Sequence, residues 1–190
     1  MRDKNNTEPL RMMVYAALFA ALTATGAYLF IPIGPVPIVL QNMFVFLCGL
    51  LLGSRWALTS VCVYVFAGAC GLPVFAGGLG GIGRIFGPTG GYLIGYMPAV
   101  YLIGKISERT DPRAIYDVIA MICGLFVLYA CGITWLKILT GMTWAKTLAV
   151  GMYPFLIGDA LKITAAVAIA KGLRPVMRLS DYKAQASGSD

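Results

Sequence analysis

The chain has 190 residues, of which 59% are hydrophobic and only 12% are charged. Soluble domains are about 45–50% apolar and about 25% charged, so this composition excludes an ordinary soluble protein. A membrane-spanning helix needs about 20 residues, and the length therefore accommodates four to six helices in one compact bundle. The sequence contains no histidine, which excludes Ser-His-Asp catalysis and the usual zinc sites.

The net charge of +7 raises the question of nucleic-acid binding, but the 15 lysines and arginines are scattered between apolar segments. A nucleic-acid-binding protein gathers such residues on one face, so we expect no nucleic-acid partner. The five cysteines are odd in number and form no C-x-x-C pair, and we interpret them as small buried hydrophobic residues. We expect neither a metal nor a cofactor.

Six apolar segments predict six transmembrane helices in a single integral membrane domain, residues 1–190. The first segment is longer than the apolar region of a secretory signal peptide, so we expect it to be retained. The connection that follows it, residues 31–38, holds three prolines and should be rigid and extended. Residues 172–190 are predicted to form a cytoplasmic tail. The expected spans are 12–31, 39–52, 56–70, 92–106, 115–139 and 147–171.

Residues 71–91 form the most unusual segment, with nine glycines and two prolines among 21 residues. This composition excludes a regular helix. Because the other residues are mostly apolar, we expect a packed or re-entrant loop that covers a cavity rather than a disordered one. A G-x-G-x-x-G pattern begins at Gly78 but lacks the strand, helix and acidic residue of a dinucleotide site. These glycines either allow close packing or line a ligand pocket.

The distribution of basic residues predicts the orientation in the membrane. If the N-terminus is cytoplasmic, eleven of the 15 basic residues lie on the inner side, and Arg84, Lys137 and Lys146 lie on the outer side. This bias follows the positive-inside rule. We therefore expect a multi-pass protein of the cell membrane with both termini in the cytoplasm and the Gly-rich loop outside.

Asp159 and Lys162 are the strongest candidates for a functional site. They lie near the centre of the sixth span, and their i, i+3 spacing places them on one helix face. A charge at the bilayer centre costs about 2.5–3.5 kcal/mol, so such residues usually face a cavity. They form either a binding or transport site or a self-satisfied pair that only fixes helix packing. Gly151 and Pro154 should loosen the outer half of this helix and open the site toward the outside.

Other polar residues could complete a binding site. Arg84 is the only basic residue of the Gly-rich loop, where it is either a surface charge or a bidentate clamp for a carboxylate. Gln41 and Asn42 begin the second span, and their amides can both donate and accept hydrogen bonds. Gly78 and Tyr92 are also predicted to bind the substrate, and Tyr92 equally fits an interfacial aromatic belt. No nucleophile-containing motif is present, so we expect no catalytic residue and no enzyme.

Small residues in the first span predict a close helix contact. They recur at i, i+4 spacing, as Ala16, Ala17, Ala20 and Ala21. In lipid, such a stripe packs either against another helix of the same chain or against a separate membrane subunit.

Four sequence blocks together resemble the BioY family, the biotin-binding S-components of energy-coupling-factor (ECF) transporters. In chain order, the blocks are Pro35-Val36-Pro37-Ile38 with Leu40-Gln41-Asn42, Gly71-Leu72-Pro73-Val74-Phe75-Ala76, Gly87-Pro88-Thr89-Gly90-Gly91-Tyr92, and Gly158-Asp159 with Lys162. The resemblance extends over about residues 10–175. One position departs from it, because Val39 stands where the family commonly has Thr before the Leu-Gln pair.

The resemblance implies six transmembrane helices, a loop-covered pocket open to the outside, and high-affinity capture of biotin for uptake by an ATP-driven transporter. It also implies a transmembrane coupling subunit and two cytoplasmic ATPase subunits as partners. The Ala-x-x-x-Ala contact of the family's first helix is matched here by Ala16 and Ala20 or by Ala17 and Ala21.

Biotin accounts for the polar residues that the sequence places in the site. We expect Asp159 to accept from a ureido N–H, Lys162 to donate to the ureido oxygen and Arg84 to bind the carboxylate. The reversed pose, with the carboxylate on Lys162, stays open. The alternative function is a stand-alone proton-coupled secondary transporter of a small carboxylate or vitamin, in which Asp159 would titrate during transport.

Overall fold

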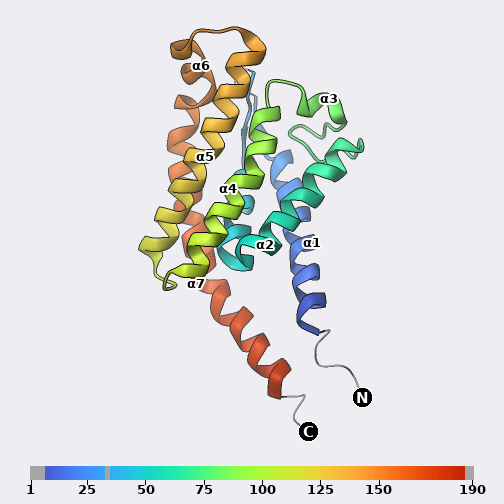
Figure 1. Ribbon diagram of the computed structural model, residues 1–190, viewed down its shortest axis with the longest axis vertical. Coiled ribbons are helices and arrows are strands. Elements are labelled where there is room, and N and C mark those ends of the chain that lie inside the picture. The colour runs from blue at the N-terminus through green and yellow to red at the C-terminus, as the bar shows by residue number, and fades with distance from the viewer. Residues whose placement is uncertain (1–6, 33–34, 187–190) are drawn as a thin grey trace.

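The structure, a computed structural model, describes residues 7–32 and 35–186. Most of this part of the chain is helical, and the long helices form a bundle with the short elements gathered at one end (Figure 1). The long helices are α1 (Thr7–Tyr28), α2 (Gln41–Ala69), α4 (Gly90–Arg109), α5 (Ala114–Thr140) and α7 (Leu156–Ala186). The short elements are β1 (Phe30–Ile31), β2 (Ile38–Val39), α3 (Ile82–Ile85), α6 (Trp144–Gly151) and a 3₁₀ turn, η2 (Tyr153–Phe155).

Within the described residues, four helical segments are long and apolar enough to cross a membrane. They are 8–28, 41–69, 114–140 and 144–175. α4 has a spanning length of 20 residues, but its glycines, tyrosines and charged last turn make it less apolar. The expected class, an all-α membrane protein, is therefore confirmed at the level of several apolar helices.

α2 contains a sharp bend at Gly53, where the backbone adopts φ 75° and ψ 178°. Glycine favours this conformation because it lacks a Cβ. The two arms diverge from the bend (Figure 1) and correspond to the predicted spans 39–52 and 56–70. Immediately after the bend, the backbone N–H and the hydroxyl of Ser54 both donate to Glu108 Oε1, at 2.6 and 2.7 Å. The carboxylate thus satisfies a backbone group that the break would leave unpaired.

The first helix is shorter at its C-terminal end than the predicted span 12–31. α1 ends at Tyr28 because the following residues pair with the chain that returns after the prolines. Phe30 pairs with Val39 and Ile31 with Ile38 in an antiparallel arrangement. The extended connection predicted for residues 31–38 is therefore a short hairpin, of which residues 33 and 34 lie outside the described part.

The predicted span 147–171 is not one continuous helix. It is divided into α6, η2 and α7, with the break at residues 152–155. Pro154 cannot donate a backbone hydrogen bond, and the N–H of Phe155 turns back to the carbonyl of Met152. The Gly151 carbonyl accepts instead from the Tyr92 hydroxyl at 2.8 Å. At its other end α7 continues as a helix to Ala186, beyond the predicted boundary at 171.

The Gly-rich loop is irregular, except that α3 forms one helical turn where we expected none. Its first part is anchored by Phe75, whose ring fills the space beside Gly68, where a Cβ would lie only 2.1 Å from the ring. Tyr64 packs edge-to-face on Phe75 at 5.7 Å. Its last part is held by Trp135, whose indole Nε1 donates to the Gly87 carbonyl at 2.9 Å. The loop is therefore packed against α2 and α5, as its apolar composition indicates.

Candidate functional site

A pocket lies at the end of the molecule that carries the hairpin, the Gly-rich loop and α6, opposite the end where α1 begins and α7 ends (Figure 1). It encloses about 620 Å³ of empty space, including the part open to solvent. Its walls are mostly apolar and come from the hairpin, the Gly-rich loop, the α6–η2 segment and the helices α2, α4, α5 and α7. Apolar wall residues include Val36, Val39, Phe75, Leu93, Leu128 and Phe155.

Asp159 is the centre of a buried polar cluster in this pocket, with a residue exposure of 2%. Its Oδ1 atom accepts from Asn42 Nδ2 at 2.7 Å and from Lys162 Nζ at 3.2 Å. Its Oδ2 atom accepts from the hydroxyl of Tyr129. A buried carboxylate is tolerated only where charge and hydrogen bonds compensate the lost hydration. These three donors supply that compensation from three different helices.

The position of Asp159 differs from the expected centre of a long helix. Because the chain breaks at residues 152–155, Asp159 lies in the first turn of α7. The partial positive charge of a helix N-terminus stabilises an anion there, typically by about 0.3–1 kcal/mol. The carboxylate therefore gains a further stabilising contribution that the predicted continuous helix would lack.

Two amide atoms in the pocket have no hydrogen-bond partner among the described residues, namely Gln41 Nε2 and Asn42 Oδ1. The orientation of the Asn42 amide follows from its neighbour, because the carboxylate of Asp159 can only accept and must face the NH₂ group. Asn42 Oδ1 is thus an acceptor that lacks a donor, and Gln41 Nε2 is a donor that lacks an acceptor. Leaving buried polar atoms unpaired costs about 1–3 kcal/mol each, so these atoms are available to hydrogen-bond with a ligand.

Five of the predicted binding residues line the pocket together: Gln41, Asn42, Tyr92, Asp159 and Lys162. Gly78 and Arg84 are not among its lining residues. Gly78 forms a turn with φ 70° close to the ring of Tyr28. Arg84 lies on α3 with its side chain exposed.

Tyr92 contributes its ring to the pocket wall, while its hydroxyl is occupied by the Gly151 carbonyl. A Cβ on Gly132 would lie 2.3 Å from the Tyr92 ring, so the ring lies directly against the backbone of α5. Tyr92 therefore bridges α4, α5 and the break before α7 in addition to lining the pocket.

Sequence reasoning missed four aromatic residues of the site. Tyr96, Tyr129 and Phe155 lie within predicted spans, and Phe75 lies in the Gly-rich loop. A hydroxyl inside an apolar segment needs a hydrogen-bond partner, so Tyr129 could have been paired with the mid-span acid Asp159. No comparable signal distinguishes Phe75 from the other apolar residues of the loop.

The alanine stripe of α1 is divided between two environments. Ala16 and Ala20 are buried, and the Ala16 carbonyl accepts from the Ser60 hydroxyl of α2 at 2.7 Å. Ala17 and Ala21 are exposed on a neighbouring face of the helix, next to exposed apolar residues such as Leu18. The first pair therefore makes the contact within the chain, and the second pair is accessible to another molecule.

An apolar pocket with a buried carboxylate–ammonium pair and two unpaired amide atoms, set in a bundle of membrane-type helices, defines a membrane-embedded protein that binds a small ligand with a polar head. The family model described as "BioY family" matches residues 1–179. The chain therefore belongs to the BioY family.

Individual relatives agree with this assignment. The biotin transporter BioY of Thermotoga maritima is 39% identical over 165 residues, which cover 87% of this chain and 96% of the relative. The probable biotin transporter BioY of Pyrococcus horikoshii is 41% identical over 158 residues, covering 83% and 93%. The crystal structure of an S-component for biotin from an ECF-type ABC transporter superposes with a TM-score of 0.83 at 31% identity, covering 90% of this chain and 94% of that one.

Proposed function

We propose that this chain captures biotin as the substrate-binding membrane subunit of an ECF-type transporter and performs no chemical reaction on it. The observation that carries the proposal is the polar cluster around Asp159, which leaves Gln41 Nε2 and Asn42 Oδ1 unpaired beside Lys162. A ureido group offers two N–H donors and one strong acceptor, which matches these unpaired atoms. The apolar walls suit the fused rings and the valeryl chain.

Binding to the purified protein tests this proposal directly. Biotin titrated into the protein in detergent, followed by calorimetry, should give one site per chain with a Kd well below 1 µM. Desthiobiotin, which keeps the ureido group, should bind, whereas valeric acid, which lacks it, should not. A heat signal no larger than that of buffer at micromolar biotin would refute the function.

The ureido end of biotin lies deepest in the proposed pose. Lys162 donates to the ureido oxygen, Asn42 Oδ1 accepts from one N–H, and Asp159 Oδ2 retains a lone pair for the other. The carboxylate then points to the mouth of the pocket, where desolvation costs less. Arg84, exposed on α3 outside the pocket wall, would meet the carboxylate only there. Gly78 would act through the shape of the loop rather than by direct contact.

Biotin methyl ester distinguishes this pose from the reversed one. If Arg84 binds the carboxylate, esterification weakens binding to the wild type but not to the Arg84→Ala variant. If Lys162 binds the carboxylate, the Lys162→Ala variant is the one that becomes insensitive to esterification. Equal sensitivity in the wild type and in Arg84→Ala would exclude Arg84 from the site.

The proposed membrane arrangement has six spans in one domain, made by α1, the two arms of α2, α4, α5, and the α6–α7 segment. α1 begins and α7 ends at the same end of the molecule (Figure 1), which supports placing both termini in the cytoplasm. The basic residues at that end support the same orientation. The native cysteines, among them the exposed Cys70, must first be replaced by alanine. In intact cells, a membrane-impermeant thiol reagent should then label Arg84→Cys from outside and leave Arg109→Cys unlabelled.

The proposed partners are a transmembrane coupling subunit and two cytoplasmic ATPase subunits. Exposed Ala17 and Ala21 support α1 as the contact, because small residues allow close approach of another helix in lipid. Ala17→Trp should prevent copurification with the coupling subunit but leave the biotin Kd unchanged. Leu161→Trp, on an exposed face of α7, is the matched control and should change neither copurification nor the biotin Kd. Copurification of Ala17→Trp at wild-type yield would exclude this face as the contact.

A further inference from the structure

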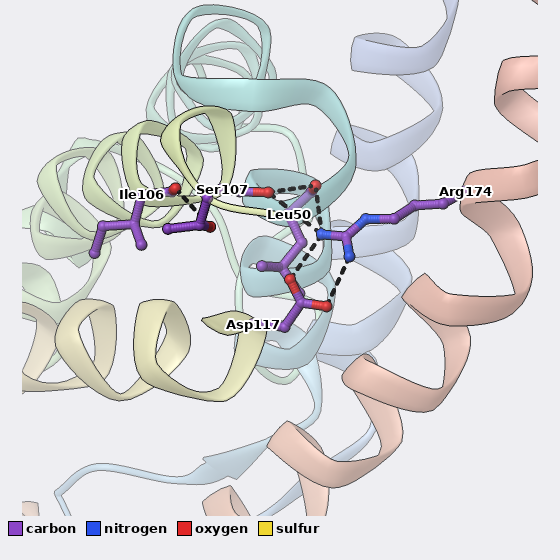
Figure 2. A network of polar contacts seen from close by, with 6 residues as sticks. Leu50, Ile106, Ser107, Asp117 and Arg174 are labelled. Atoms are coloured by element: carbon purple, nitrogen blue, oxygen red, sulfur yellow. Dashed lines mark hydrogen bonds and ion pairs between the residues drawn. The ribbon is translucent and has the colours of Figure 1, made fainter. Parts of the chain in front are cut away.

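A second buried ion pair lies at the end of the bundle opposite the pocket. Arg174 of α7 makes two parallel hydrogen bonds to Asp117 of α5, from Nη1 to Oδ2 and from Nη2 to Oδ1, both 2.7 Å. The same Nη2 lies 3.3 Å from the Ser107 hydroxyl of α4 and 3.4 Å from the Leu50 carbonyl of α2. Figure 2 shows the guanidinium group reaching from α7 into this junction of three other helices.

This ion pair differs from an ordinary surface salt bridge. The side chains of Asp117 and Arg174 are only 5% and 16% exposed. The fork geometry fixes the guanidinium in direction as well as in distance, which a single contact to a lysine would not do. Arg174 also precedes Pro175, which interrupts the hydrogen bonding of α7. Beyond this point, α7 runs past the ends of α4 and α5 (Figure 1).

Between its two polar ends, α7 touches the bundle through a narrow stripe. Its buried residues recur every three or four positions, and between the pocket and Arg174 they include Ala166 and Ala170, both with no exposed surface. The rest of the helix is largely exposed, including Ile157 at 78% and Leu161 at 69%. Alanines allow close approach but offer little side-chain interlocking, so they weakly resist rotation or sliding of α7.

The two polar contacts of α7 join the same pair of elements. At the pocket end, Asp159 of α7 accepts from Asn42 of α2. At the other end, Arg174 of α7 donates to the Leu50 carbonyl, further along the same arm of α2. Asp159 and Arg174 are separated by about 22 Å along one helix at 1.5 Å per residue. A helix fixed at both ends transmits a rotation at one end to the other.

We propose that Arg174 is a positioning residue for ligand binding: by clamping α7 onto α2, α4 and α5, it fixes the rotation of α7 and so holds Asp159 and Lys162 in register with Asn42. The inference rests on the proposed function and adds to it a determinant of affinity that touches neither pocket nor ligand.

The test must remove the clamp without leaving a buried charge unpaired. Loss of one partner alone strands the other charge, whereas replacement of both by apolar residues of similar size is often neutral for stability. The paired variant Asp117→Leu/Arg174→Met meets this requirement, and the Ser107 hydroxyl still donates to the Leu50 carbonyl at 3.1 Å. The matched control is the same exchange at the exposed pair, Asp111→Leu/Arg113→Met, whose side chains are 69% and 68% exposed.

Calorimetric titration of biotin into each full-length variant separates positioning from a purely structural role. If Arg174 positions the binding residues, the paired variant should bind biotin with a Kd about ten times that of the wild type and with the same stoichiometry. Substitutions remote from a binding site change affinity by this order of magnitude. A purely structural role lowers the number of active sites while the remaining sites keep the wild-type Kd, and this result would overturn the proposal. The control variant should bind like the wild type.

The wild-type titration in the same experiment keeps the two hypotheses apart. If the wild type binds no biotin, the proposed function fails. If the wild type binds and the paired variant has the same Kd, only the role of Arg174 fails. If the apolar variant does not fold, the paired variant Asp117→Asn/Arg174→Gln takes its place, because it also lacks the two charges. Its Kd for biotin should rise in the same way, and a wild-type Kd would refute the role of Arg174.

Discussion

The hydroxyl of Tyr129 offers the sharpest test of the binding site. Tyr129→Phe removes the donor to Asp159 Oδ2 and keeps the ring that forms part of the pocket wall. The other two donors, Asn42 and Lys162, both contact Oδ1. The variant therefore leaves the second carboxylate oxygen without a partner and frees the group to rotate.

The expected loss follows from the strength of this one interaction. A hydrogen bond to a charged group contributes about 1.5–3 kcal/mol. Since 1.4 kcal/mol corresponds to a tenfold change in Kd, biotin should bind about 10- to 150-fold more weakly if the carboxylate must be held in place. The apolar contribution to binding should stay the same, because the ring is retained.

Calorimetry of the purified variant measures this effect, with Tyr101→Phe as the matched control. Tyr101 is on α4 with 43% of its surface exposed, so its hydroxyl should not influence binding. A Kd for Tyr129→Phe within twofold of the wild type would refute the role given to the Asp159 carboxylate. Weaker binding in both variants to the same extent would point to a general effect of losing a tyrosine.

Two further predictions concern the framework of the site. Gly132→Ala places a Cβ 2.3 Å from the Tyr92 ring and should lower the free energy of unfolding by about 1–3 kcal/mol. Gly172→Ala, which has open space around it, is the control and should not lower it. Equal melting temperatures for the two variants would contradict this prediction. Partial burial opposes ionisation of Glu108, but the hydrogen bonds from Ser54 and the nearby lysine outweigh it and lower the pKa of the carboxyl. The wild type should thus be more stable than Glu108→Gln above about pH 4.5, and this difference in stability should disappear as the pH falls further. Thermal unfolding of both proteins from pH 7 to 3 measures the difference. A difference in stability that does not change with pH would exclude ionisation of Glu108 as its source.

The sequence predicts those features of the fold that depend on local patterns. The turn at Gly53 follows from a glycine between two apolar segments. The missing N–H of Pro154 predicts a loosened helix, which the structure shows as a full break between α6 and α7. The burial of Asp159 and Lys162 follows from the cost of charge in an apolar segment. Each of these conclusions needs only neighbouring residues and the solvent.

Features that depend on distant residues could not be predicted in this way. Asn42 meets Asp159 across 117 positions of sequence, and Arg174 meets Asp117 across 57. As the only cation of its loop, Arg84 is a candidate for the pocket on composition alone, yet α3 holds it outside the lining residues. Charge and composition identify candidates, but only the packing of the helices decides which candidates meet.

The division of the alanine stripe on α1 has a consequence for how such a protein can change. Ala17 and Ala21 face away from the bundle, and no residue of α1 lines the pocket. Under the proposed function, recognition of the ligand and recognition of the coupling subunit are therefore encoded by separate sets of residues. Substitutions on the outer face of α1 would then adapt the chain to a different transport machinery while the captured vitamin stays the same. Substitutions around Asp159 would alter the captured vitamin without disturbing the assembly.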